Sequence, residues 1–352
     1  ARWTINNRGL WPVFLGAMEA MPRIRRTLVQ GAAVCAITAV LFVSGSEILL
    51  RAFYPQVTMF PRWEPSPAYG VVLPKNATMV HRRPGRWEFQ YTINEDRCRG
   101  PRVPVTAVAD DTVVVTLGDS YTMGMGVGDG EEFPAVLARE LDDGYRVLNC
   151  GSPGWGLTQE VRRFYEFALQ YSPRVVILQF CANDPEDGRR DAVTRVENNR
   201  FVFHSTSHGP NPIFNALSKY RLIQSSQLYA LFRAWYESRR NAGRAHAAAV
   251  SKAEQDYIEL LGAFARDLNA RKIRLIMISV TGQLDEFPAI RASVMALQDE
   301  KVLRYVEVAD WFKGIDNFAS PEGHRWGATA HAIVGKELAR TVRESNAAAD
   351  GR

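Results

Sequence analysis

Cysteine and histidine are scarce in this chain, and their scarcity excludes two kinds of framework. Four cysteines in 352 residues are too few for a disulfide-stapled scaffold. Those at positions 150 and 181 end apolar runs and are predicted to be small buried hydrophobic residues. The six histidines are scattered without the spacing of metal ligands, so we expect no metal site and no cofactor. At 46% hydrophobic and 23% charged, the composition also excludes a disordered chain.

An excess of positive charge is nearly absent once the first residues are set aside. The formal net charge is +5, and residues 1–60 hold six arginines against only Glu19 and Glu47. The rest of the chain is therefore close to neutral, without the basic footprint typical of nucleic-acid binding. We expect no nucleic-acid partner.

A long uncharged segment follows the basic cluster Met21–Arg26. Residues 27–46 contain no charged side chain, and twenty helical residues are enough to cross a bilayer. Arginines on the near side favour a cytoplasmic start, with the bulk of the chain across the membrane. The sequence therefore predicts a single-pass anchor that contacts the lipid bilayer through residues 27–46. A signal peptide cleaved near residues 43–45 and a buried core helix are the alternatives.

Apolar runs alternate with amphipathic stretches from Thr112 onward. Five of these runs are predicted to be strands: VVVTLG, YRVLNCG, PRVVILQFC, KIRLIMISV and VLRYVEVAD. Strands that are apolar throughout are typical of a parallel sheet with helices on both faces. We therefore predict a three-layer, flavodoxin-like α/β fold that closes with a helix at about residues 321–344. In such folds the sites lie at the carboxyl ends of the strands.

Four segments and one insertion are predicted along the chain. They are a cytoplasmic leader at 1–26, a transmembrane anchor at 27–50, a β-rich lead-in at 51–111, the α/β domain at 112–345, and an insertion in that domain at about 189–251. Residues 1–17 precede the first methionine and are given no structural role. The insertion contains a hairpin pattern and two helical patterns. We interpret it as a packed surface insertion, with a cap over the site or a membrane contact as alternatives.

Residues suited to ester chemistry follow each of the first three strands of the α/β domain. Ser120 stands in GDSYTMGMGVG, Gly154 in NCGSPGWGLTQE and Asn183 in CAND. A serine that opens a helix lies where backbone N–H groups can stabilise an oxyanion. A glycine N–H and an asparagine amide can donate hydrogen bonds to the same oxyanion. Each segment taken alone is as typical of an ordinary strand-to-helix turn.

In this order, the three segments resemble the SGNH (GDSL-type) hydrolase family. The resemblance covers about residues 112–184 and again 306–338. It implies that Ser120 is the nucleophile and that Ser120, Gly154 and Asn183 form the oxyanion hole. One departure is a cysteine at position 181, where the family has the glycine of its GxND motif.

The same motifs, together with the lead-in YTINEDRCRGP, look like a membrane-anchored bacterial branch of the family. Some relatives in that branch act on acyl groups of exopolysaccharides. The resemblance implies an esterase or deacetylase in the bacterial inner membrane, with its domain facing the periplasm or exterior. It would act through an acyl-Ser120 intermediate on an acylated small molecule or polysaccharide. An O-acetyltransferase that uses the same acyl-enzyme is a close variant.

The segment that should supply the catalytic base is irregular. The family places its acid and base in one loop before the last helix, as DxxH or DxH. On the stretch DNFASPEGH, that pattern puts Asp316 at the acid and Phe318 at the base. Phenylalanine cannot accept a proton, and His324 then matches a second histidine that is usually not catalytic.

Two interpretations of His324 stay open. In the first, Ser320 and Pro321 begin the last helix, and the helix dipole keeps a nearby imidazole neutral, as a general base requires. In the second, His324 is structural and the site is silent, which predicts a membrane-tethered carbohydrate-binding or assembly protein. His331 is a further candidate for the base, with less support from its position.

Overall fold

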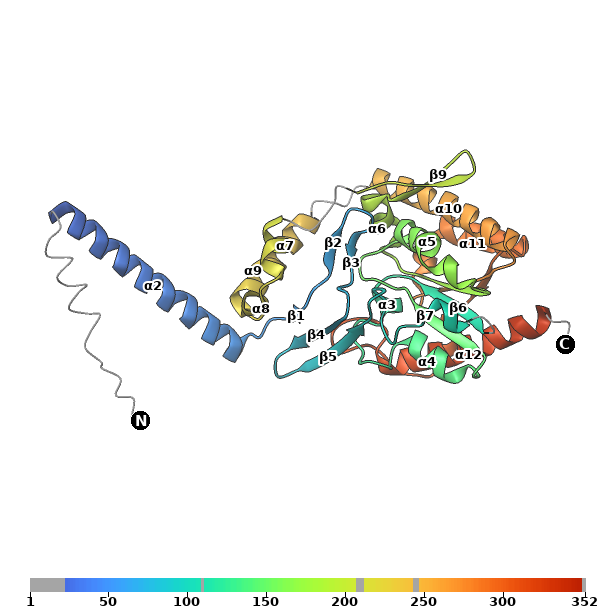
Figure 1. Cartoon of the computed structure of the whole chain (residues 1–352), viewed down its shortest axis with the longest axis horizontal. Helices are drawn as coiled ribbons and strands as arrows, with labels where there is room; N and C mark the ends of the chain where they lie inside the picture. Colours follow the sequence, from blue (N-terminus) through green and yellow to red (C-terminus); the bar gives the residue numbers. More distant parts are fainter. Residues whose placement is uncertain (1–22, 109–110, 207–211, 243–246, 350–352) are drawn as a thin grey trace.

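The computed structural model describes residues 23–108, 111–206, 212–242 and 247–349. Residues 1–22 of the predicted cytoplasmic leader lie outside the described residues. The described chain starts with helix α2 (Arg23–Phe53), which extends away from an α/β body in Figure 1. Within the described residues it is the one helix that is long and apolar enough to span a membrane.

A five-stranded parallel sheet forms the centre of the α/β body. Its strands lie in the order β12-β11-β8-β6-β7. Their bounds are Thr112–Leu117 for β6, Tyr145–Asn149 for β7, Val175–Phe180 for β8, Arg274–Ser279 for β11 and Arg304–Val306 for β12. Strands β6, β8 and β11 are almost wholly buried, which explains why their sequences are apolar at successive positions. The predicted three-layer fold is confirmed.

Helices cover both faces of the sheet, and each face has its own apolar core (Figure 1). One face packs against α5 (Leu157–Glu166), α10 (Ala247–Ala270) and α11 (Pro288–Asp299), and the other against α4 (Phe133–Glu140) and α12 (Ala328–Ala349). The next two strands of the chain, β7 and β8, lie on opposite sides of β6 in the sheet. The carboxyl ends of these three strands therefore meet at the switch point where α/β folds place their sites.

The lead-in between α2 and the sheet is a small β structure. It contains β1 (Thr58–Phe60), β2 (Glu64–Ser66), β3 (Gly70–Val72), β4 (Ala77–Arg83) and β5 (Trp87–Ile93). Strands β1, β4 and β5 form one antiparallel sheet, and β2 pairs with β3. The apolar core of the lead-in includes Met123, which lies three residues after Ser120. The lead-in therefore packs directly on the loop of the expected nucleophile.

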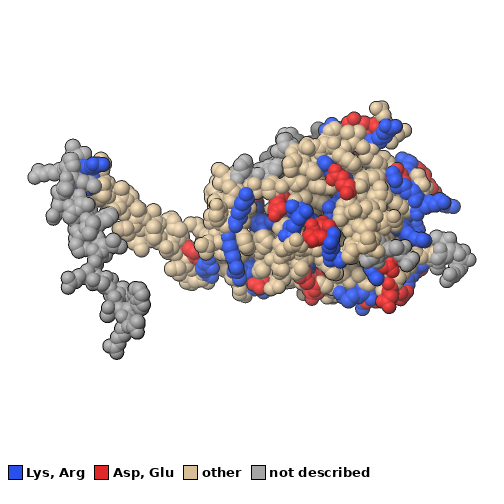
Figure 2. Space-filling model, in the orientation of Figure 1, with Lys and Arg blue, Asp and Glu red and all other residues tan. Residues whose placement is uncertain are grey.

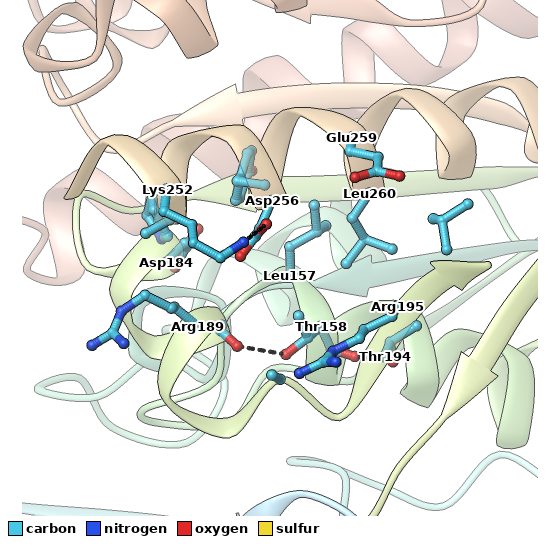
Figure 3. Close-up of a pocket in the computed structure, with 16 residues that line it drawn as sticks. Leu157, Thr158, Asp184, Arg189, Thr194, Arg195, Lys252, Asp256, Glu259 and Leu260 are labelled. Atoms are coloured by element: carbon cyan, nitrogen blue, oxygen red, sulfur yellow. Dashed lines mark hydrogen bonds and ion pairs between the residues drawn. The ribbon is translucent and has the colours of Figure 1, made fainter. Parts of the chain in front are cut away.

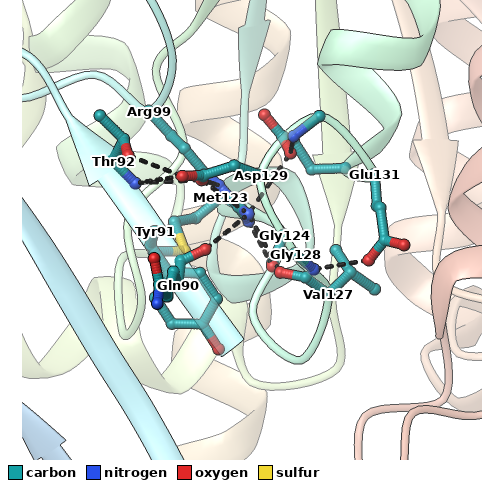
Figure 4. A network of polar contacts seen from close by, with 12 residues as sticks. Gln90, Tyr91, Thr92, Arg99, Met123, Gly124, Val127, Gly128, Asp129 and Glu131 are labelled. Carbon is teal, nitrogen blue, oxygen red and sulfur yellow. Dashed lines mark hydrogen bonds and ion pairs between the residues drawn. The ribbon is translucent and has the colours of Figure 1, made fainter. Parts of the chain in front are cut away.

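Arg99, just after β5, fixes that loop through a buried guanidinium group. It donates hydrogen bonds to the carbonyl oxygens of Met123 (3.1 Å), Gly124 (2.6 Å) and Val127 (3.0 Å), as Figure 4 shows. The same group forms ion pairs with Asp129 and Glu132, at 3.2 and 3.4 Å. A buried arginine is tolerated because its donors are satisfied in this way.

The predicted insertion, at about 189–251, starts near the end of α6 (Asp184–Asp191) and contains the predicted hairpin, which is formed by β9 (Thr194–Glu197) and β10 (Arg200–Phe203). It continues with α7 (Pro212–Ser218), α8 (Arg221–Gln224) and α9 (Gln227–Ala242). Helix α9 lies against the end of α2, because the Glu47 carboxylate accepts hydrogen bonds from Ser226 Oγ and from the N–H groups of Gln227 and Leu228, at 2.9–3.0 Å. A carboxylate from α2 thus caps the N-terminus of α9.

The last helix begins later than predicted. Helix α12 starts at Ala328, whereas the sequence pattern placed the start near Pro321. Ser320 does not cap a helix, because its hydroxyl donates to the carbonyl oxygen of Gly126, 2.7 Å away. Its own N–H donates to the carbonyl of His324 at 2.9 Å, which closes residues 320–324 into a turn.

Two carboxyl groups are buried in the α/β body: Glu160 on α5 and Asp184 on α6. Both oxygens of Glu160 and Oδ1 of Asp184 lack a hydrogen-bond partner among the described residues. Burial raises the pKa of each group well above its ordinary value, and the nearby charge of Asp119 adds to the shift of both. At any pH at which these two groups are charged in the unfolded chain, folding is therefore accompanied by the uptake of protons.

The variant Glu160→Gln is expected to be more stable than the natural protein at pH 8. A pKa raised by folding gives stability that is complete below the ordinary carboxyl range and is lost as pH rises. Relative to the variant, the natural protein should thus lose stability from about pH 4 upward, at up to ~1.4 kcal/mol per pH unit for each affected group. Urea unfolding in detergent at pH 4–8 measures the difference, with Glu259→Gln on the exposed face of α10 as the control. Parallel curves for the natural protein and the Glu160 variant would contradict the assignment.

Candidate active site

The turn after β6 presents Ser120 at the carboxyl edge of the sheet. Gly118 has φ +154°, and a Cβ there would lie 2.2 Å from Thr122 Oγ1 and 2.6 Å from Gln179 Oε1, so only glycine fits. Asp119 follows, and its Oδ1 accepts the N–H of Tyr121 at 3.0 Å. This bond starts the short helix α3 (Ser120–Met123), which leaves the Ser120 side chain partly exposed.

His324 lies against Ser120, and a carboxylate lies against His324. The Nε2 atom of His324 is 3.0 Å from Ser120 Oγ, and its Nδ1 atom is 2.5 Å from Glu322 Oε2. Serine hydroxyl, imidazole and carboxylate are therefore linked in one line, the order that activates a serine nucleophile. Of the two sequence interpretations of His324, this geometry is the one expected for a relocated base.

The expectation about Asp316 in the same segment needs correction. Asp316 does not contact His324; it is exposed and forms no hydrogen bond or ion pair with any described residue, and Glu322 takes the place expected of it. Phe318 does not separate the histidine from the serine, because its ring stacks on Phe312, with centroids 4.6 Å apart.

The turn at residues 320–324 explains why Glu322 can reach His324. Ser320 Oγ accepts the N–H of Glu322 at 3.2 Å, while it donates to Gly126 in the nucleophile loop. Glu322 Oε2 also accepts the N–H of His324 at 3.3 Å, so carboxylate and imidazole face each other across one tight turn. The ring of Tyr121 packs edge-on against His324, with centroids 4.9 Å apart.

Electrostatics favour a charged Glu322. Partial burial raises its pKa, but the hydrogen bond and charge interaction with His324 outweigh burial, and the pKa of Glu322 lies below its ordinary value. Asp119 behaves differently, because burial raises its pKa despite the hydrogen bond from Tyr121. An ionised Glu322 is suited to stabilise the imidazolium that forms when His324 takes a proton.

Asn183, one of the expected oxyanion donors, lies near Ser120, and polar contacts connect it to the loop of Gly154. Asn183 Nδ2 and Ser120 Oγ both lie 3.4 Å from the same atom, Oδ2 of Asp119. Asn183 Nδ2 also donates to Asp187 Oδ2 at 2.7 Å. The other oxygen of Asp187 pairs with an arginine, Arg190, which donates to the carbonyl of Gly154 at 3.0 Å. These two charged residues link the loops of Gly154 and Asn183, and the sequence patterns did not single them out.

Comparison with known proteins agrees with this geometry. The GDSL-like lipase/acylhydrolase family model matches residues 116–316. The chain belongs to this family. The match confirms the resemblance of the sequence motifs and extends over more than half of the chain. No curated protein matches.

Solved structures with a similar fold include other members of the family. A G-D-S-L family protein from Desulfitobacterium hafniense is 16% identical, with a TM-score of 0.41 over 65% of this chain and 99% of its own. A GDSL-like lipase from Bacteroides thetaiotaomicron is 14% identical, with a TM-score of 0.39 over 68% of this chain and 94% of its own. A carbohydrate acetylesterase from Sinorhizobium meliloti is 10% identical, with a TM-score of 0.38 over 66% of this chain and 99% of its own.

The other histidine considered as a base has a structural position in this GDSL-family chain. His331 is fully buried on α12, and its Nδ1 accepts the N–H of Phe133 at 3.1 Å. Burial lowers the pKa of His331 to about 3, so the ring is neutral and holds α12 against α4. Among the described residues, no group of three or more His, Cys, Asp or Glu side chains is arranged to hold a metal ion.

Two cavities lie near these elements. One, of about 330 Å³, lies between α6, β9 and α10, and the Lys252–Asp256 ion pair of α10, at 2.9 Å, forms part of its wall (Figure 3). None of the three linked residues lines it. The other, of about 260 Å³, lies between β1 and α9, and Glu322 forms part of its wall.

The two candidate carboxylates can be separated by substitution. We expect Glu322→Gln to lower kcat for 4-nitrophenyl acetate by about 10³–10⁴, because the imidazolium loses its ionised partner and the imidazole its tautomer. Asp316→Asn, at an exposed position, should leave kcat within about twofold, the range of a surface substitution. Steady-state hydrolysis by both variants decides the matter. If the Asp316 variant lost activity instead, the assignment to Glu322 would be wrong.

Proposed function

We propose that this chain is a membrane-tethered, extracytoplasmic esterase or deacetylase that acts through an acyl-Ser120 intermediate. The observation that carries the proposal is the hydrogen-bonded line from Ser120 through His324 to Glu322. Membership of the GDSL-like family supports hydrolysis of an ester bond. A base candidate beside the serine favours this function over the silent-site alternative.

The first half of the reaction transfers the acyl group to the enzyme. Ser120 Oγ attacks the ester carbonyl carbon while His324 Nε2 accepts the hydroxyl proton, and Glu322 stabilises the imidazolium. The oxyanion receives hydrogen bonds from the N–H groups of Ser120 and Gly154 and from the Asn183 amide. The bond to the alcohol oxygen then breaks, His324 returns its proton to the leaving alcohol, and an acyl-serine remains.

The second half releases the acyl group to water. His324 takes a proton from a water molecule, the resulting hydroxide attacks the acyl carbon, and the carboxylic acid leaves as Ser120 regains its proton. A sugar hydroxyl in place of water would give the O-acetyltransferase variant. No observation on the site favours that acceptor, so hydrolysis is the function proposed.

An acylated polysaccharide is the substrate class we propose. Support comes from the cavity beside Glu322, which is lined by Trp63 and by two donors with unsatisfied hydrogen bonds. Arg62 Nε and the Tyr229 hydroxyl are buried there without a partner among the described residues. Sugar rings are rich in hydroxyl groups that can satisfy such donors, and they pack well against an aromatic face.

Covalent labelling of the nucleophile tests the reaction type. We expect a fluorophosphonate probe to label the natural protein and Ser120→Ala to abolish labelling, since the probe needs an activated serine oxygen. Asn183→Ala should keep the fold and slow hydrolysis of 4-nitrophenyl acetate by about 10²–10³. Acetate release from acetylated polysaccharides, assayed with the same preparation, tests the substrate class separately. Full labelling of the Ser120 variant would overturn the esterase proposal.

Helix α2 and the helices of the insertion support the membrane tether. The most apolar window of the helical segment Arg25–Phe53 has no buried residue in the isolated chain, and Figure 2 shows most of the segment's length as almost uncharged surface. Beyond α2 and the residues that follow it, most of the exposed large apolar side chains lie on α7–α9: Ile213, Tyr220, Leu222, Phe232 and Trp235. Because Glu47 and Arg51 bind α9 to the end of α2, we propose that this apolar surface rests in the bilayer interface.

Spin labels report whether the surface of α7–α9 meets lipid. In a Cys35→Ser background, nitroxides are placed singly by Leu222→Cys, Trp235→Cys, Phe203→Cys and Val40→Cys in nanodiscs. Labels at 222, 235 and 40 should be reached by oxygen more than by a water-soluble nickel chelate, and the label at 203 on the distant hairpin should show the reverse. Water-like accessibility at both 222 and 235 would exclude the interfacial contact, whatever the label in α2 reports.

A further inference from the structure

Two of the four cysteines are in contact across the boundary between the lead-in and the sheet. Cys98 follows β5, Cys150 follows β7, and their sulfur atoms are 3.7 Å apart. Both side chains are buried, at 4% and 2% exposure. The two residues are far apart in sequence and come from separate layers, so their contact depends on the packing of the lead-in onto the domain.

The surroundings make one of these thiols more reactive than the other. Arg163 Nη2 lies 3.3 Å from the Cys98 sulfur. A hydrogen bond from Cys150, opposed by burial and helped by the charge of Arg163, lowers the pKa of Cys98 to about 7. The same pairing raises the pKa of Cys150 well above its ordinary value. Cys98 also lines a cavity of about 260 Å³, whereas Cys150 does not. A thiolate with such access is the group that attacks a disulfide.

We propose that Cys98 and Cys150 form a native disulfide bond that joins the lead-in to the sheet. The proposal rests on the extracytoplasmic location given under Proposed function, because disulfides persist in oxidising compartments. The sulfurs, 3.7 Å apart, would have to approach to the ~2.05 Å of a bond. The remaining cysteines offer no competing pair within reach, since Cys35 lies in α2 and Cys181 at the end of β8.

The oxidant is the disulfide form of a thiol-disulfide carrier. The Cys98 thiolate attacks one carrier sulfur, which gives a mixed disulfide and releases one carrier thiolate. Cys150 then loses its proton and attacks the Cys98 sulfur, which releases the second carrier thiolate. Two thiols are oxidised, one carrier disulfide is reduced to a dithiol, and the two protons pass to the carrier. The cavity that Cys98 lines is the side from which the carrier reaches this sulfur.

The bond would enclose the nucleophile loop in a covalent ring. The residues between Cys98 and Cys150 include Arg99, Ser120 and the whole loop that Arg99 holds. Closing a ring of this length restricts the unfolded chain and stabilises the folded one. The bond would therefore secure the contact between the lead-in and the Ser120 loop.

Thiol trapping on the full chain tests the proposal. Protein expressed in bacterial membranes is denatured in the presence of N-ethylmaleimide, which blocks free thiols. It is then digested without reductant and analysed by mass spectrometry. We expect a linked peptide pair containing Cys98 and Cys150, with maleimide on Cys35 and Cys181. Dithiothreitol should lower the Tm of the natural protein by roughly 5–15 °C and leave the Tm of a Cys98→Ser/Cys150→Ser variant unchanged.

The controls separate this proposal from the one on function. A Cys35→Ser/Cys181→Ser variant should keep the linked peptide, which excludes exchange during handling. Hydrolysis of 4-nitrophenyl acetate is measured on the same samples, so that loss of esterase activity and absence of the bond are seen independently. Maleimide on both Cys98 and Cys150 in protein from the membrane would overturn the proposal and leave two thiols that merely pack as apolar side chains.

Discussion

The buried guanidinium of Arg99 is the contact on which the geometry around Ser120 depends. An unpaired charge in this position would be strongly unfavourable, so the carbonyls and carboxylates of residues 123–132 must converge on it. The fit is close, because a Cβ at Gly124 would lie 2.7 Å from Arg99 Nη1. The loop in turn presents the Gly126 carbonyl to Ser320, and Ser320 shapes the turn that holds Glu322 and His324. One cation in the lead-in thereby sets both halves of the site.

The acidic groups around Ser120 divide into two kinds with different roles. Glu322 has a hydrogen-bond partner and a lowered pKa, so it supplies a fixed negative charge to His324. Asp119, Glu160 and Asp184 are more deeply buried, and burial raises the pKa of each. Raised pKa values cluster at functional sites because the burial that shields a reaction from water also makes the ionised form of nearby carboxyl groups less favourable. These buried carboxyl groups therefore lower the stability of the folded chain near the point where the carboxyl ends of β6, β7 and β8 meet.

Much of the fold and part of the site could be predicted from the sequence alone. Five apolar runs gave the parallel sheet, since burial on both faces leaves a local and continuous signature. Ser120 could be singled out because a strand end and a family motif mark it, whereas the role of His324 stayed open because the family pattern places the base at Phe318. Glu322 could not, because it lies two residues before His324 and reaches it only in a turn closed by the distant carbonyl of Gly126. The start of α12 was misplaced for the same reason, since Ser320 bonds to another loop instead of capping a helix.

The lead-in and the insertion, which fall outside the strand-and-helix pattern, connect the membrane end of the chain to the chemistry. Strand β1 and helix α9 enclose the cavity whose wall includes Glu322, and α9 itself is capped by Glu47 of α2. The other end of the lead-in carries Tyr91, whose hydroxyl accepts the Gly126 N–H at 3.0 Å, next to the carbonyl that orders residues 320–324. A displacement of α9 relative to β1 would therefore change the cavity on the acid side of the site while Arg99 keeps the serine side fixed. The two sides of the site are thus held by different contacts: the Ser120 loop is held by the buried Arg99, whereas the cavity beside Glu322 is bounded by β1 and α9.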